Sequence, residues 1–404
     1  QIYANDNVSI RLPGEVGGMQ TVSANSLEVI ESGEDAGVAR GLEAKFGGEV
    51  EYLETYADKD GGDSQLSRRI VSENLSAGLD RDLIGLHVAT FTGGVRVDTG
   101  SLTGSAEQVI YDVVSEQVDF SGTDDQGRGP LLNDARGAVL ATTINVHLDG
   151  PNIRATGSVS SVLSSSQDDS DGNSETKRPQ LLRQDAPIYV TSNEFSYDAD
   201  TSAATYTGSS RLWQDATEFR ANSLVLDEAS GDVTAVGAVE TQIPLFQNTE
   251  DSDERVEVVA RGSAASFEYA DLSRTATYAT TATLVTDVID LSGTSIQLYL
   301  EPDGRSLARI FASGDVKLIL EGRQMAGETM TYYEVDGRYE MTGDPVRIVE
   351  ELTADADDGD MDTVECRETT GQALTFYVTS EALTVDAQSD VRTTSANQPC
   401  PAGP

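Results

Sequence analysis

The sequence has little of what enzyme sites and membrane helices are built from. It contains two cysteines and two histidines in 404 residues. No apolar run approaches the roughly 18 residues that cross a bilayer as a helix, and no segment shows the i, i+3, i+4, i+7 stripe of an amphipathic helix. His87 and His147 lie in strand-like segments, where a structural or surface role is favoured over a catalytic one. No enzyme activity, cofactor or metal site is therefore expected.

Positive charge is also scarce, with 27 basic residues against 69 acidic ones and a formal net charge of −42. Such a balance argues against nucleic acid and anionic membranes as direct partners. It fits a solvated exterior in salty water, where self-repulsion is screened, and suggests a saline habitat. Pairs of carboxylates carry no catalytic information in so acidic a chain. The acidic segment 168–175 resembles a calcium loop in composition but lacks its ligand spacing, so a solvated loop is favoured.

What the chain does have is a repeat. An aromatic or apolar anchor is followed eleven positions later by glycine five times and by threonine once. These pairs are Tyr111 and Gly122, Val146 and Gly157, Tyr197 and Gly208, Leu226 and Gly237, Tyr332 and Gly343, and Tyr269 and Thr280. Apolar residues alternate with polar ones on both sides of a turn-rich break such as 198–202, which is typical of two antiparallel strands joined by a turn. The repeat predicts an all-β, antiparallel protein.

The alternation also predicts which side chains share the buried face, because a strand turns every second residue to the same side. This inward set consists of the anchors and their period-2 neighbours: Val109, Tyr111, Val118, Phe120, Phe195, Tyr197, Tyr206, Leu224, Leu226, Val233, Phe267, Tyr269, Tyr278, Met330, Tyr332, Tyr339 and Met341. The glycine that closes each copy is expected to mark a bend or bulge between strands. Trp213, the only tryptophan, is expected in the core rather than at a ligand.

The pattern of a small residue, an apolar residue, Tyr-Asp, a turn, and then alternating apolar residues before glycine resembles the OstA-like repeat of lipopolysaccharide-transport proteins. The segments AEQVIYDVVSEQVDFSG, SNEFSYDADTSAATYTG and GETMTYYEVDGRYEMTG carry the resemblance most clearly. That family includes the periplasmic bridge LptA, the membrane-anchored LptC and the N-terminal domain of LptD. The resemblance covers about residues 70 to 390. This chain is about twice as long as the usual bridge protein and far more acidic.

The resemblance implies an elongated, open β-jellyroll, or solenoid-like stack, whose groove holds lipid acyl chains without chemistry. The inward set then lines the groove, and the ligand is lipopolysaccharide. Its implied partners are LptC-like and LptD-like jellyroll domains, or another copy, docked end to end through strand edges. The implied location is the periplasm, after export with a targeting segment that this chain lacks. An extracellular location is the alternative.

The expected organisation has five segments. Residues 1–69 form a divergent N-terminal β region that resembles an LptC-like unit, and residues 70–163 and 188–394 are OstA-like repeats. A polar low-complexity loop spans 164–187, and a C-terminal tail spans 395–404. Cys366 and Cys400 are expected to form a disulfide in an oxidising compartment, although two buried thiols would have the same sequence pattern.

A function of another class fits the same composition and repetition: a structural β-solenoid, as in an extracellular filament or adhesin. A transporter needs an open groove lined by apolar residues, whereas a filament subunit should have a closed, filled core. A glycan-active right-handed β-helix is less favoured, because the tight Asp- and Gly-containing turns indicate antiparallel connections.

Overall fold

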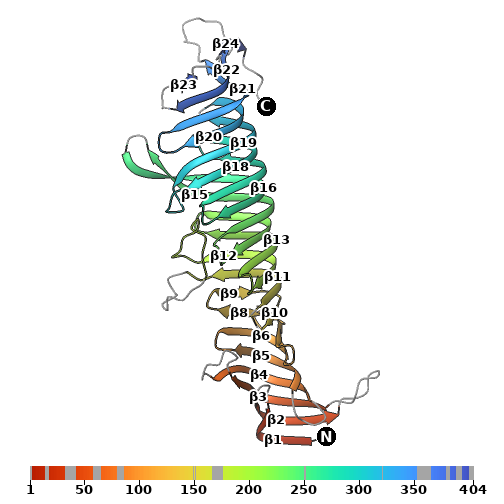
Figure 1. Ribbon diagram of the computed structural model, residues 1–404. Helices are drawn as coiled ribbons and strands as arrows, with labels where there is room; N and C mark the ends of the chain where they lie inside the picture. Colours follow the sequence, from red (N-terminus) through yellow and green to blue (C-terminus); the bar gives the residue numbers. More distant parts are fainter. Residues whose placement is uncertain are drawn as a thin grey trace. The chain divides into compact units, whose positions relative to one another are not determined.

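The computed structural model of the protein is built of antiparallel β-strands (Figure 1). The structure describes residues 2–13, 18–31, 42–57, 65–79, 86–148, 150, 152–165, 176–249, 252–320, 322–352, 365–378, 383–387 and 394–399. These residues form twenty-four strands and no helix, which confirms the predicted all-β antiparallel stack. Accordingly, the described part of the chain holds no helix of the length and apolarity that a membrane crossing needs.

The chain divides into two compact units, of which unit 1 comprises Gln1–Asp168 and Ala186–Gly208. Its strands are β1 (Ile2–Pro13), β2 (Met19–Glu31), β3 (Leu42–Ala57), β4 (Gln65–Leu79), β5 (Leu86–Asp98), β6 (Leu102–Asp112), β7 (Gln117–Ser121), β8 (Leu131–Asp134), β9 (Gly137–Leu140), β10 (Thr143–His147), β11 (Asn152–Leu163) and β12 (Ile188–Asp198). Consecutive strands pair from β1 to β6, and β6 then pairs with both β7 and β8. Strand β11 pairs with β9, β10 and β12.

Unit 2 comprises Asp169–Asp185 and Ser209–Pro404, and strand β13 (Ala203–Gln214) contributes its second half to it. The other strands are β14 (Thr217–Asp227), β15 (Val233–Thr249), β16 (Ser252–Ala270), β17 (Thr275–Val285), β18 (Ile289–Leu300), β19 (Leu307–Leu320), β20 (Arg323–Tyr333), β21 (Arg338–Leu352), β22 (Glu365–Val378), β23 (Leu383–Ala387) and β24 (Thr394–Pro399). Each strand from β14 to β22 pairs with the next, and β22 pairs with both β23 and β24. The five-segment division stays a prediction.

The long strands bend where the sequence places its repeated glycine. In β15, Gly237 and Ala238 both have a left-handed backbone, with φ of +82° and +49°, and the pairing register shifts between Val236 and Val239. Glycine is favoured at the first position because a Cβ disfavours this conformation. The same pair of left-handed residues occurs at Gly157 and Ser158. The predicted bend at the repeat glycine is therefore present.

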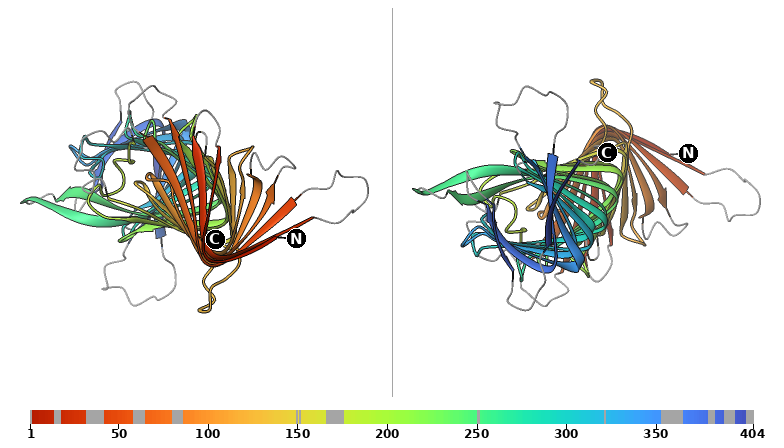
Figure 2. Two further views of the ribbon diagram at one scale, coloured as in Figure 1. Left: turned by 90° about the horizontal axis from the view of Figure 1, so that it is seen from below. Right: turned by 90° about the horizontal axis from the view of Figure 1, so that it is seen from above.

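The bend divides each long strand into two arms. We call the half that carries the repeat anchors the anchor arm and the other half the opposite arm. Seen end-on in Figure 2, the red and orange strands of unit 1 fan out from the bend as two arms of a V. We call the open side of the V, between the turn ends of the arms, the mouth. Inward side chains of the two arms meet, because a Cβ added to Gly104 of the opposite arm would lie 2.4 Å from the ring of Phe120 on the anchor arm.

Each sequence repeat is a β-hairpin of the anchor arm. Leu224 and Leu226 of β14 pair with Ala235 and Val233 of β15. The equivalent residues pair in the copies at Tyr111, Val146, Tyr269 and Tyr332, as Phe267 with Tyr278 does across β16 and β17. The eleven-residue spacing is thus the distance from an anchor, around the hairpin turn, to the next bend. Side chains of successive copies stack on one inward face.

Two parts of the chain differ from the sequence-based expectation. Residues 394–399, expected to lie mostly in a tail, form β24 against the free half of β22. Trp213, expected in the core, is half-buried, with the Arg211 guanidinium 4.7 Å from its ring centre. Its neighbours Leu212 and Gln214 take the inward positions, so the period-2 rule turns Trp213 outward.

The close approach of the arms gives a first prediction. A Cβ added to Gly262 of β16 would lie 2.4 Å from the ring of Tyr278, which is buried. We expect Gly262→Ala to lower the free energy of unfolding by about 1–3 kcal/mol, because the ring must shift in a packed core. Gly78→Ala is the matched control, since its added Cβ meets nothing closer than 3.9 Å. Denaturant unfolding of both variants measures the difference, and equal stabilities would contradict contact between the arms.

Candidate functional site

A cavity of about 470 Å³ lies between the two arms of unit 1, at the β1 end of its strands. It is lined almost entirely by aliphatic and aromatic side chains, and Glu31 is the one charged residue among them. The apolar lining consists of Ile2, Ile10, Leu12, Val22, Leu27, Val29, Ile30, Leu42, Phe46 and Leu86. The cavity falls within the range of about 300–1,000 Å³ that is typical of small-ligand sites. An alkyl chain suits such a lining, because burial of each methylene contributes about 0.8 kcal/mol.

The inward set predicted from the repeat does not line this cavity. Its side chains lie elsewhere between the arms and pack against one another. All of its members are buried except Tyr197 and Tyr332, which are half-buried. Both exceptions precede hairpin turns: the Arg136 guanidinium lies 3.6 Å from the ring centre of Tyr197, and the Tyr332 hydroxyl donates to Glu334. Rings pack closely within the set, as Phe267 and Tyr278 do at 4.9 Å between centroids. These side chains are thus in mutual contact rather than around an open channel.

A polar cluster crosses the mouth of unit 1. Arg68 of β4, on the opposite arm, donates to the Tyr111 hydroxyl and to Glu116 at the anchor-arm turn, both at 2.9 Å. The Tyr111 hydroxyl donates in turn to Glu54 of β3 at 3.0 Å, and Gln20 donates to Glu54 at 3.2 Å. We call these five residues the clasp. Because they join the free ends of both arms, they hold this part of the mouth closed.

The electrostatics of the clasp follow from its burial. The side chains of Glu54 and Arg68 are 9% and 11% exposed, and their charged atoms lie 3.5 Å apart. Burial raises the pKa of the Tyr111 hydroxyl, and the Glu54 carboxylate raises it further. Burial likewise raises the pKa of Tyr52, which lies beside the clasp. Both phenols therefore stay protonated at physiological pH, and Tyr111 can serve as a donor to Glu54.

Two other segments cross the mouth of unit 2. Residues 176–185, which we call the strap, form no strand but bury Leu181 and Leu182. The hairpin of β15 and β16 extends past the opposite arm, and the main-chain nitrogen of Phe246 donates to the Arg305 oxygen at 3.0 Å. Arg305 belongs to the turn between β18 and β19, on the anchor-arm side. The strap belongs to the predicted polar loop 164–187, of which residues 166–175 lie outside the described residues.

The arrangement of possible metal ligands, histidines and cysteines bears on what chemistry the protein could perform. Among the residues with a described position, no group of three or more His, Cys, Asp or Glu side chains is arranged to hold a metal ion. His87 and His147 are exposed. Cys366 is buried and disulfide-bonded. Since Cys400 lies outside the described residues, its pairing with Cys366 stays a prediction.

Comparisons with known proteins found similarity among solved structures alone. Neither a family model nor a curated protein matches the sequence. One similar solved structure is LptH from Pseudomonas aeruginosa, described as the LptA-homologous periplasmic component of the lipopolysaccharide transport device. The two chains are 18% identical, with 30% of this chain and 78% of LptH covered, at a TM-score of 0.24. A likeness this low does not decide function, so the functional argument depends on the cavity and the arms.

The sequence pointed to one part of this site and missed two others. It identified the inward face of the anchor arm through its alternation. It missed the clasp, although Val50, Tyr52 and Glu54 alternate in β3, which would have placed Glu54 inward. It also missed the cavity at β1 and β2, because the repeat is weakest in this part of the chain.

Proposed function

We propose that the protein binds the alkyl chains of an amphiphile between its two arms, with the cavity at β1 and β2 as the first binding site. The observation that carries the proposal is the apolar lining of that cavity, which holds a single charged side chain. An amphiphile fits better than a wholly apolar ligand, because the charged Glu31 lies beside the apolar lining of the cavity. No step of this function requires catalysis.

In its specific form, the proposal is that the amphiphile is lipopolysaccharide and that the protein carries it across the periplasm. The OstA-like repeat supplies this ligand and this location. The partners are then LptC-like and LptD-like jellyroll domains, or a second copy, docked at strand edges. Among the strands that the structure describes, β1 pairs with β2, so its other side offers such an edge, and unpaired strand edges accept further strands.

A structural filament subunit is the second candidate, and one observation favours it. The inward set is filled by its own side chains, with Leu224 and Met341 fully buried. A filled interior suits a load-bearing solenoid, whereas a carrier must open its interior to load. The two functions therefore differ in whether the arms accept a ligand.

The cavity gives a second prediction. Ile10 lines the cavity and is half-buried, whereas its neighbour Ser9 is exposed on the other face of β1. We expect Ile10→Glu to weaken binding of a fluorescent fatty acid about tenfold or more, because the carboxylate must be desolvated against the alkyl chain. Ser9→Glu adds the same charge one residue away and is expected to bind as the unmodified protein does. Fluorescence titration measures both affinities.

The same titration separates the two candidate functions. Saturable binding that Ile10→Glu weakens and Ser9→Glu does not supports the carrier. Absence of saturable binding by the unmodified protein, with a carrier protein as positive control, overturns the carrier proposal and leaves the filament ahead. Co-purified lipid, detected by native mass spectrometry, then identifies the amphiphile and tests lipopolysaccharide directly.

A further inference from the structure

The strap is tied to both sides of the mouth of unit 2. On the anchor-arm side, the main-chain nitrogen of Lys177 donates to the Glu228 oxygen at 2.6 Å. The main-chain nitrogen of Gln180 donates to the Asp271 carboxylate at 2.7 Å. Glu228 and Asp271 belong to two successive hairpin turns, after β14 and after β16. The first half of the strap therefore runs along the turn ends of the anchor arm.

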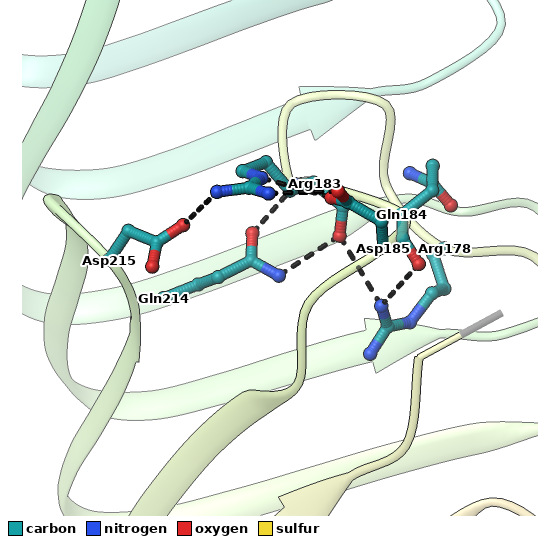
Figure 3. A network of polar contacts seen from close by, with 6 residues as sticks. All are labelled: Arg178, Arg183, Gln184, Asp185, Gln214 and Asp215. Atoms are coloured by element: carbon teal, nitrogen blue, oxygen red, sulfur yellow. Dashed lines mark hydrogen bonds and ion pairs between the residues drawn. The ribbon is translucent and has the colours of Figure 1, made fainter. Parts of the chain in front are cut away.

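On the opposite arm, one glutamine side chain holds the strap. The main-chain nitrogen of Arg183 donates to Oε1 of Gln214 at 2.6 Å, and Nε2 of Gln214 donates back to the Arg183 oxygen at 2.9 Å (Figure 3). Gln214 ends β13 and is buried. The Arg183 guanidinium also contacts Asp215, the next residue, at 2.9 Å. The amide of Gln214 thus pairs with the strap as a neighbouring peptide group would.

Between these two attachments the strap places alkyl groups inside unit 2. Leu181 and Leu182 are 5% and 2% exposed. The main chain at Leu181 lies beside the hydroxyl of Tyr269, a member of the inward set. The strap also fits closely against the turn after β18, since a Cβ added to Gly304 would lie 2.6 Å from the Gln180 oxygen. Two leucine side chains of the strap are therefore buried in unit 2, where the main chain of Leu181 lies beside the anchor Tyr269.

The strap is held differently from the walls around it. The walls are strands in continuous antiparallel ladders, such as β15 with β16, whereas residues 176–185 belong to no ladder. The side chains of Gln214 and Asp271 hold the strap through hydrogen bonds. Arg183 also forms an ion pair with Asp215, and both of these side chains are about half exposed. Exposed ion pairs contribute little to stability. The strap can therefore leave its position without the opening of a strand ladder.

We propose that the strap is a displaceable stopper for the interior of unit 2. Leu181 and Leu182 fill the space beside Tyr269 until an alkyl chain replaces them, and the strap then moves out of the mouth. This inference rests on the proposed function, and it names how that function is regulated. Loading of unit 2 then depends on strap release, whereas the cavity at β1 and β2 needs no such step.

The test uses the full-length protein and a palmitate analogue that carries a photoreactive diazirine at the end of its chain. Hydrogen exchange of the amides in 176–185 is measured with and without the probe, and photo-adducts are mapped by mass spectrometry. We expect the probe to speed exchange in the strap and to label peptides from β16 and β17. Gln214→Ala removes both hydrogen bonds to Arg183, so labelling in unit 2 should rise about fivefold or more.

Gln242→Ala is the matched control. Gln242 also lies at the end of the opposite arm, but its side chain donates to the Ala216 oxygen rather than to the strap. We expect this variant to label as the unmodified protein does. If Gln214→Ala does not fold, as judged by circular dichroism, the double variant Leu181→Ser and Leu182→Ser replaces it, and the exchange measurement on the unmodified protein requires no variant.

Each outcome decides between the two proposals. Adducts at β1 and β2 with an unchanged strap, and equal labelling of unit 2 in both glutamine variants, would overturn the stopper while leaving the carrier function intact. No adducts anywhere would overturn both. Adducts in unit 2 that appear only with faster strap exchange, and that increase in Gln214→Ala alone, support the stopper.

Discussion

Leu226→Glu is expected to lower the free energy of unfolding by about 4 kcal/mol or more, because it places a carboxylate in a packed interior without a partner. Leu226 is 4% exposed and pairs with Val233, which pairs in turn with Tyr269. The introduced carboxyl has a raised pKa in the folded protein, so the folded state binds a proton more readily than the unfolded state. The loss of stability should therefore shrink as the pH falls toward that pKa and below it.

Val225→Glu is the control for this variant. Val225 is the neighbouring residue of β14, half-buried on the outer face, and we expect a loss of about 1 kcal/mol or less, with little pH dependence. Urea unfolding between pH 4 and pH 8 measures both variants. Equal stabilities of the two variants would mean that the interior at Leu226 is open to water, and the description of a filled anchor arm would then be wrong.

Arg68→Met is expected to lower the free energy of unfolding by about 3–5 kcal/mol. The substitution keeps much of the apolar stem but leaves Glu54 buried beside Tyr111 without its cation. Removal of one partner from a buried ion pair is costly for this reason, whereas replacement of both partners by apolar groups is often nearly neutral. The loss arises from the unpaired carboxylate rather than from the net strength of the pair.

The double variant Arg68→Met and Glu54→Met tests that explanation. We expect it to recover most of the stability lost in Arg68→Met, because no buried charge is left uncompensated. Denaturant unfolding of both single variants and the double variant completes the cycle. Additive losses in the double variant would indicate that Arg68 and Glu54 act independently and that the clasp is not a unit.

How much of the fold and of the candidate site could be predicted depends on how far apart in the sequence the contacting residues lie. The anchor hairpins were predictable, because Leu226 and Val233 are brought together by a turn whose residues lie between them in the sequence. The bends were predictable from glycine, since the left-handed backbone at Gly237 favours it. Both features involve residues that are close in the sequence, so the spacing of residue types along the chain indicates them.

The clasp and the strap could not be found in this way. Glu54 and Tyr111 are 57 residues apart, and Gln180 and Asp271 are 91 apart. Leu181 and Leu182 are two apolar residues in a polar context, without the alternation that marks a strand. Within each unit, the stacking of many hairpins is what brings such distant residues together. These long-range contacts join the two arms within each unit.

The pairing of each strand with its neighbour in sequence has a consequence for folding. Local ladders such as β14 with β15 close short loops, so hairpins can form early and add to one another in order. The clasp and the strap close much longer loops, which costs more chain entropy. We therefore expect the ladder to assemble first and the mouth to be sealed last. A nascent chain would pass through an intermediate whose alkyl-lined interior is still accessible, and an amphiphile present at that moment could be enclosed without any later opening.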